Sequence, residues 1–175
     1  MKKQVIYAEF ISRLFSATVD SFLLSILLPP IVNVISTLIY RYSFREYLNI
    51  IQTDTNTNIS ASISVFYTQS FYDYLLSTDK MSIHITCSII MTVITFMLIG
   101  TYFICFWSYV SATPGKLILG MKIVDSTTLN KPSLTQLFKR YFAYLTVPIG
   151  IWFILFTKKR QALHDKIAST AVVKS

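Results

Sequence analysis

An arginine and an aspartate stand in an otherwise apolar stretch near the start of the chain. Between Leu14 and Tyr40 the only charged residue is Asp20, and Arg13 directly precedes that stretch. A carboxylate near the centre of a membrane helix costs about 2.5–3.5 kcal/mol on insertion scales, so it is retained for a reason. Such a group either binds a cation or a proton, or it is neutralised by a partner elsewhere in the fold.

A helix through this stretch aligns further polar groups with Asp20. Glu9, Arg13, Ser16 and Asp20 are spaced by four, three and four residues, so they form one polar stripe. Arg13 and Asp20 are seven residues apart, about 10 Å of helical rise, and they share a face without the usual i,i+4 contact. We therefore expect each of them to need a partner from another segment.

Composition indicates an integral membrane protein. The chain of 175 residues is 53% hydrophobic and 14% charged, with a mean hydropathy of +0.54. We predict transmembrane helices over residues 14–40 and 83–112, because both stretches exceed the roughly 20 residues that cross a bilayer. The net charge of +8 comes from lysines and arginines at the edges of apolar runs, which favours membrane orientation over nucleic-acid binding.

The sequence contains no pattern typical of a cofactor or a catalytic site. Cys87 and Cys105 match no zinc or thioredoxin-type spacing and are expected to be small buried residues. His84 is expected to form an interfacial hydrogen bond rather than to act as a ligand. With no nucleophile–base pair and no metal-ligand cluster, we expect neither a cofactor nor enzymatic activity.

The C-terminal half predicts a broken apolar hairpin and a small β element. The apolar region of about residues 138–157 is short for a span and is interrupted by Pro148 and Gly150, so we predict a re-entrant hairpin or a short third span. Residues 117–124 are predicted as a strand, followed by a hairpin-like loop over residues 125–131. Residues 169–173 are predicted to pair with residues 122–124. A helix is expected to begin at Pro132-Ser133, capped by Ser133.

The charges predict the orientation in the membrane. Basic residues lie before the first span, after the second span and on both sides of the broken hairpin, whereas the connection 41–82 is acidic on balance. By the positive-inside rule both termini are expected to be cytoplasmic and the connection 41–82 external. That connection is predicted to contain short interfacial helices rich in aromatic residues, separated by a mobile loop over residues 52–64.

Three segments, in order along the chain, resemble the RDD family of bacterial integral membrane proteins. They are the Arg13–Asp20 stripe, the turn and strand Ser111–Asp125, and the ending Arg160–Val173 with its Leu-His-Asp triplet. The resemblance implies one domain over residues 1–175 in the bacterial inner membrane. The arginine and two aspartates of the family name correspond to Arg13, Asp20 and Asp165. The sequence departs from the family pattern at Ser12-Arg13, where two arginines are common, and at Ala168-Ser169-Thr170, where Ala-Gly-Thr is expected.

The resemblance leaves two functions open, because membrane transport has only been suggested for the family. In the first, Asp20 binds an ion or proton, Arg13 tunes its pKa, and Asp165 with His164 guards the cytoplasmic mouth, within a homo-oligomer. In the second, Arg13, Asp20 and Asp165 form a structural ion-pair network in a scaffold or accessory subunit of other membrane proteins. Glu9, Ser16 and His164 are supporting residues in either case.

The fold class that these patterns predict is an all-α membrane protein. It has two transmembrane helices, a broken apolar hairpin and a small cytoplasmic β-hairpin-like element. The lipid bilayer is its expected partner, and no nucleic acid is.

Overall fold

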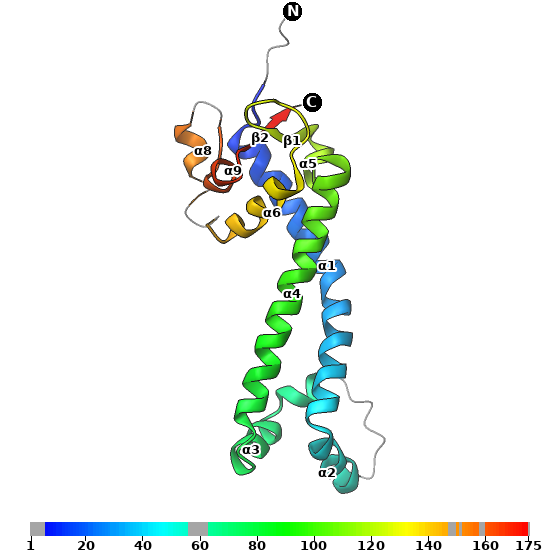
Figure 1. Cartoon of the computed structure of the whole chain (residues 1–175). Coiled ribbons are helices and arrows are strands. Elements are labelled where there is room, and N and C mark those ends of the chain that lie inside the picture. Colours follow the sequence, from blue (N-terminus) through cyan, green and yellow to red (C-terminus); the bar gives the residue numbers. More distant parts are fainter. Residues whose placement is uncertain (1–5, 56–62, 147–149, 151, 158–159, 175) are drawn as a thin grey trace, which may run out of the picture. The chain divides into compact units, whose positions relative to one another are not determined.

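The computed structural model describes residues 6–55, 63–146, 150, 152–157 and 160–174, and these are mostly helical (Figure 1). The chain divides into two compact units. Unit 1 contains Met1–Leu24 and Ile99–Ser175, and unit 2 contains Ser25–Leu98. Each unit is described by itself below.

Two helices are long and apolar enough to cross a membrane. They are α1 (Phe10–Ser43) and α4 (Met81–Val110). Only 6% and 11% of the most apolar windows in these two segments are buried, whereas the core helix of a soluble protein would be mostly buried. The predicted stretch 14–40 lies within α1, which is continuous through Pro29 and Pro30. The predicted stretch 83–112 overruns α4 by two residues, because Ser111 has a positive φ of 58° and ends the helix.

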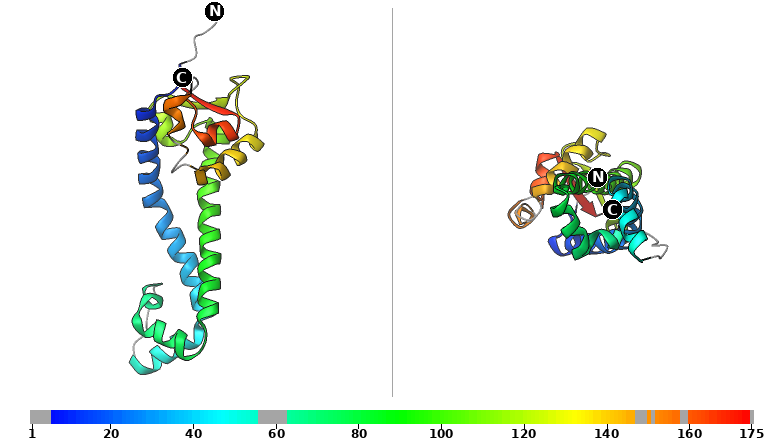
Figure 2. Two further views of the ribbon diagram at one scale, coloured as in Figure 1. Left: turned by 90° about the vertical axis from the view of Figure 1, so that its left-hand side faces the viewer. Right: turned by 90° about the horizontal axis from the view of Figure 1, so that it is seen from below.

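Unit 1 contains a two-stranded antiparallel sheet (Figure 2). Its strands are β1 (Met121–Asp125) and β2 (Thr170–Lys174), with Lys122 opposite Val173 and Val124 opposite Ala171. The predicted pairing of these segments is confirmed. The N-terminal segment lies along the other edge of β2, since Ala8 N donates to Val172 O at 2.9 Å and Lys174 N donates to Ile6 O at 2.9 Å.

The prediction that a strand begins at Leu117 is wrong. Helix α5 (Pro114–Ile118) includes Leu117 and Ile118, and the strand itself begins at Met121. Proline stands in the first turn of α5, where a missing N–H costs nothing. Gly120, with φ of +61°, then ends the turn and leads into β1. The β-branched and partly alternating residues predict β structure, but the positions of Pro114 and Gly120 favour a helical turn before the strand.

The loop after β1, which is predicted as hairpin-like, leads to the predicted helix, α6 (Leu134–Phe142). Strand β2 is supplied by the end of the chain, as predicted. The Asp125 carboxylate organises the loop by accepting from Thr127 N at 2.7 Å and Thr128 N at 2.9 Å. The predicted cap of α6 is confirmed: Ser133 and Gln136 form a reciprocal capping box.

The third apolar region consists of short elements where the structure describes it. These are the end of α6, the 3₁₀ helix η2 (Ala143–Thr146) and α8 (Phe153–Phe156). The break predicted at Pro148 lies outside the described residues. The last helix, α9 (Leu163–Ile167), directly precedes β2.

In unit 2 three short helices follow the end of α1. They are α2 (Arg45–Thr55), η1 (Ile63–Tyr67) and α3 (Gln69–Ser77). Short helices were predicted for the connection 41–82, but most of its aromatic rings are buried against one another rather than spread over a surface. Helix α2 also extends into the predicted mobile loop, and residues 56–62 of that loop lie outside the described residues. The buried cluster consists of Tyr40, Phe44, Tyr47, Phe66, Phe71, Tyr74, Leu75 and Cys87.

The isolated histidine and the cysteines also have defined places. The Tyr40 hydroxyl lies 3.3 Å from His84 Nδ1, so His84 is a hydrogen-bonding residue of the aromatic cluster. Cys87 is buried, as expected, but Cys105 is exposed, so the expectation of burial is wrong for Cys105. Both cysteines are free thiols.

Candidate functional site

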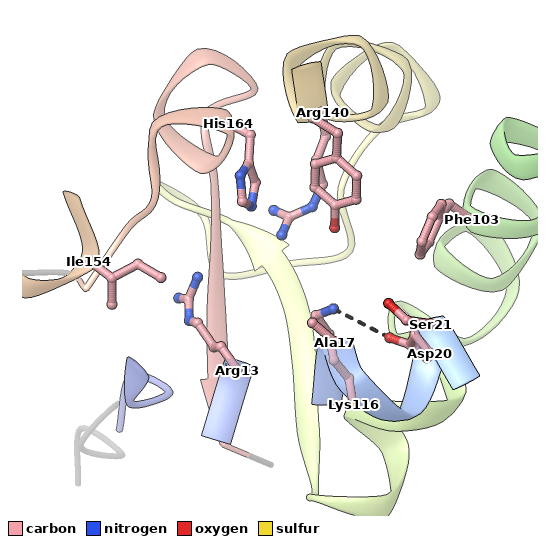
Figure 3. Close-up of a pocket in the computed structure, with 10 residues that line it drawn as sticks. Arg13, Ala17, Asp20, Ser21, Phe103, Lys116, Arg140, Ile154 and His164 are labelled. Carbon is pink, nitrogen blue, oxygen red and sulfur yellow. Dashed lines mark ion pairs between the residues drawn. The ribbon is translucent and has the colours of Figure 1, made fainter. Parts of the chain in front are cut away.

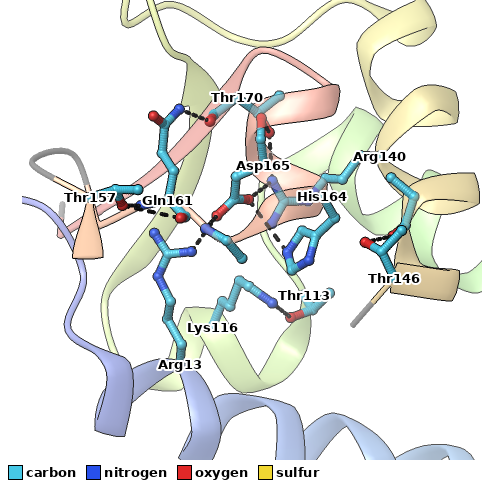
Figure 4. A network of polar contacts seen from close by, with 12 residues as sticks. Arg13, Thr113, Lys116, Arg140, Thr146, Thr157, Gln161, His164, Asp165 and Thr170 are labelled. Carbon is cyan, nitrogen blue, oxygen red and sulfur yellow. Dashed lines mark hydrogen bonds and ion pairs between the residues drawn. The ribbon is translucent and has the colours of Figure 1, made fainter. Parts of the chain in front are cut away.

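The Asp165 carboxylate is fully buried and surrounded by cationic and donor groups (Figure 4). Arg13 Nη1 donates to Asp165 Oδ2 at 2.5 Å, and Arg140 forms an ion pair with Oδ1. The imidazole Nε2 of His164 lies 3.5 Å from Oδ1. Two guanidinium groups from α1 and α6 therefore converge on one carboxylate of α9.

Local sequence explains why Asp165 is held in this position. Asp165 is in the first turn of α9, and its Oδ2 accepts the backbone N–H of Ala162 at 3.0 Å. A carboxylate there satisfies a free N–H and interacts favourably with the helix dipole. Arg140 Nη1 also donates to Thr170 Oγ1 at 2.6 Å, which ties the start of β2 to the same cluster. The cluster thus connects α1, α6, α9 and β2.

Asp20 is buried at a separate place and has different donors. Its Oδ2 accepts from the Thr113 hydroxyl at 2.5 Å, and its Oδ1 accepts from Gly115 N at 2.8 Å. Lys116 Nζ lies 4.0 Å from Oδ2. The Asp20 carboxylate therefore accepts a hydrogen bond from the start of α5, where free backbone N–H groups need acceptors.

Helix α5 approaches α1 so closely that Gly115 has no room for a side chain. A Cβ at this position would lie 2.2 Å from Ser16 O and 3.0 Å from Asp20 Oδ1. The missing side chain lets the backbone N–H of Gly115 reach the Asp20 carboxylate.

Arg13 therefore contacts Asp165, while Asp20 pairs with Lys116. Ser16 is buried, and its hydroxyl donates to Arg13 O at 2.9 Å, within α1. Glu9 is exposed and pairs with Arg160 at 3.2 Å, so it does not join the buried groups. His164 contacts both Asp165 and the Tyr144 ring, whose centroid lies 4.7 Å from that of the imidazole.

Sequence reasoning missed two of the central cations, Arg140 and Lys116. The sequence predicts Arg140 only as a charge that orients the membrane helices. In the structure its side chain is buried, with only 1% of the residue exposed. A signal was present, because Leu137, Arg140 and Tyr141 follow an i, i+3, i+4 pattern that predicts one buried face of α6. Lys116 gives no comparable signal, since its burial depends on how closely α5 approaches α1.

Burial and neighbouring charges determine the protonation states of His164 and Asp165 in α9. Burial and the nearby cations Arg140, Arg13 and Lys116 lower the pKa of His164 to about 3, against the opposing effect of Asp165. Burial alone would raise the pKa of Asp165, but Arg140, Arg13 and His164 together hold it below its usual value. At neutral pH the cluster therefore combines an ionised Asp165 with a neutral His164.

A cavity of about 310 Å³ lies beside both carboxylate clusters (Figure 3). Charged and polar groups from α1, α5, α6 and α9 line part of it, and aromatic and aliphatic side chains line the rest. The lining residues are Arg13, Ala17, Asp20, Ser21, Phe103, Lys116, Arg140, Tyr144, Ile154 and His164. Among the described residues, no group of three or more His, Cys, Asp or Glu is arranged to hold a metal ion.

Comparison with known proteins identifies the family. The RDD family matches residues 7–169, which include both buried aspartates and Arg13. The chain is also 42% identical to Uncharacterized protein RP437 of Rickettsia prowazekii (strain Madrid E), over 100% of both chains. No solved structure gives a significant match. With a family match over nearly its whole length, this chain belongs to the RDD family.

Proposed function

We propose that this RDD protein is a multi-pass membrane scaffold or accessory subunit, in which Arg13 and Asp165 form a structural ion-pair network and Asp20 has a separate structural role. The observation that carries the proposal is that both aspartates already have protein donors. Asp165 has Arg13, Arg140 and the Ala162 N–H, and Asp20 has Thr113, Gly115 and Lys116. A buried carboxylate with this many donors has little capacity left for a cation.

The contribution of this network to stability can be judged from the free energy that its loss would cost. Removing one partner of a buried ion pair leaves an uncompensated charge and costs about 3–5 kcal/mol. Here the loss of Asp165 would leave two buried guanidinium groups facing each other. The network thus fastens α9 and β2 to the start of α1, and it involves no catalytic step.

The proposed setting is the bacterial inner membrane. Both termini are cytoplasmic, residues 41–82 are external, and the broken apolar region 138–157 re-enters on the cytoplasmic side. Support comes from the two helices long enough to span, the family membership and the distribution of basic residues. The proposed partners are lipids, further copies of the chain or other membrane proteins.

Transport of ions or small solutes is the second candidate, and the cavity beside Arg13 favours it. The two candidates are separated by reconstituting the protein in liposomes and measuring cation-driven proton flux. The scaffold proposal expects no flux above empty liposomes, and lower unfolding midpoints for Asp20→Asn and Asp165→Asn. Wild-type flux that disappears in a folded Asp20→Asn variant would contradict the scaffold proposal and support transport.

A further inference from the structure

The cavity in unit 1 carries more positive than negative charge. Three cations, Arg13, Lys116 and Arg140, line it. Two carboxylates face these cations: Asp20 at the cavity wall and Asp165 behind it. Three positive and two negative groups leave one positive charge, and His164 adds none because it is neutral at neutral pH.

Several buried donors of these cations have no acceptor among the described residues. Arg13 is 7% exposed, and its Nε and Nη2 are both buried without a hydrogen-bond partner there. Arg140 Nε is likewise buried without a hydrogen-bond partner among the described residues. Lys116 Nζ has the Thr113 hydroxyl at 3.4 Å and Asp20 at 4.0 Å, which leaves its remaining N–H groups available. Buried donors of this kind are costly unless an acceptor meets them.

The carboxylates are already neutralised by cations or hydrogen-bond donors. Asp165 Oδ2 accepts from Arg13 and the Ala162 N–H, and Oδ1, which has no hydrogen-bond partner among the described residues, forms an ion pair with Arg140. Asp20 accepts from the Thr113 hydroxyl and the Gly115 N–H. A cation entering the cavity would meet three positive groups and compete with these donors. An acceptor with negative charge would instead pair with the free N–H groups.

We propose that this cavity binds an oxyanion, a carboxylate or phosphate group carried on a compact apolar body. The charged ends of Arg13, Arg140 and Lys116 point into the same space, where they can meet the oxygens (Figure 3). Phe103, Tyr144 and Ile154 supply apolar wall for the body of the ligand. A volume of about 310 Å³ fits a small organic anion better than a bare inorganic ion. Ala17 and Ser21 line the cavity and are exposed on α1, so the cavity opens beside them.

The ligand can be a free solute or the acidic head of a membrane lipid, and both offer the same chemistry. This site is distinct from the structural role proposed for the aspartates, because it uses donors that the aspartates leave unpaired. A protein without transport activity can therefore still bind the anion, and failure of one proposal leaves the other standing.

Binding is tested with benzoate and phenyl phosphate as probes, against benzamide as the uncharged counterpart of benzoate. The protein carries Trp152→Phe and is purified in dodecyl maltoside, so that Trp107 is its remaining tryptophan. Trp107 reports on the site because the Arg140 guanidinium lies over its ring at 5.4 Å. We expect a saturable change in Trp107 emission with at least one of the two anions, and at least about tenfold weaker binding of benzamide.

Two variants alter the cavity by different means. Lys116→Met removes one cation at similar length, and Ala17→Phe fills the entrance without changing charge. Both are expected to weaken anion binding by at least about tenfold. Lys122→Met, which removes an exposed lysine of β1, is the matched control and should bind as the parent protein does.

Two results would overturn the proposal. Equal responses to benzoate and benzamide, or anion binding unchanged in folded Lys116→Met and Ala17→Phe, would show that the cavity is not an oxyanion site. The source of the anion is resolved in nanodiscs. Weaker benzoate binding in phosphatidylglycerol than in phosphatidylcholine supports a lipid headgroup as the occupant, and equal binding in both supports a free solute.

Discussion

The two buried aspartates of unit 1 differ in the kind of donor that each accepts. Asp165 is neutralised mainly by the side chains of Arg13 and Arg140, whereas Asp20 is hydrogen-bonded by a hydroxyl and a backbone N–H. Asp165 thus holds two cations that would otherwise repel each other, and Asp20 positions a turn of backbone. At the residue scale, Arg13 therefore pairs with Asp165, and Asp20 has separate donors.

His164 should make the stability of the protein depend on pH. Its folded pKa of about 3 lies below the ordinary value of 6.5, so between these values the unfolded chain binds more protons than the folded one. The free energy of unfolding should therefore fall as the pH is lowered from 6.5 to 5, by up to about 1.4 kcal/mol per pH unit. Asp165 is ionised in both states across this range and adds no slope.

The measurement is denaturant titration in micelles at pH 7.5, 6 and 5, for the wild type and His164→Gln. The variant should show a flatter dependence, and His84 is present in both proteins, so its contribution cancels. The account of His164 would be wrong if both proteins lost stability equally between pH 7.5 and pH 5.

The elements of unit 1 depend on close backbone approach at α5. Gly115 lets α5 contact α1, and Gly120 ends α5 with a positive φ. The two glycines therefore have different physical roles. One is required by packing and the other by backbone conformation.

A pair of alanine substitutions separates these roles. Gly115→Ala should cost about 2–3 kcal/mol, because its Cβ would displace α5 from Ser16 and weaken the bond to Asp20. Gly120→Ala should cost only about 1 kcal/mol, since nothing lies within 4 Å of its added Cβ and only the backbone is strained. Both are measured as the free energy of unfolding in micelles. Equal costs for the two substitutions would contradict the packing role of Gly115.

Much of the element structure could be predicted from the sequence, for physical reasons that differ by element. The long helices follow from the length of the apolar stretches. The β1–β2 pairing follows from two short β-branched segments, each of which needs a partner strand. Helix α5 was missed because five residues are too few to show a helical period against an alternating apolar pattern. Arg140 was missed because a charge beside an apolar run reads equally well as an orientation signal and as a buried partner.

At the scale of the whole molecule, the distribution of charge predicts the topology in the membrane. A reporter fused after Ser175 should be active on the cytoplasmic side. A cysteine at the exposed position Gln52, in a background with serine at Cys87 and Cys105, should react with an impermeant maleimide added outside cells. An external C-terminal reporter would rule out the re-entrant hairpin, and Gln52→Cys labelling only after lysis would reverse the orientation.

The network also predicts which distant segments of the chain are energetically coupled. Arg13 and Asp165 are 152 residues apart in sequence and in direct contact at 2.5 Å. Arg13 and Asp20 are close in sequence, yet they have separate partners. Coupling should therefore follow the contact and not the sequence distance.

A pair of double-mutant cycles tests this central claim most directly. Free energies of unfolding in micelles are measured for Arg13→Met, Asp165→Asn, Asp20→Asn and the two double variants that contain Arg13→Met. We predict a coupling energy of about 2–3 kcal/mol between Arg13 and Asp165, and one within about 0.5 kcal/mol of zero between Arg13 and Asp20. A larger coupling of Arg13 to Asp20 than to Asp165 would contradict the account.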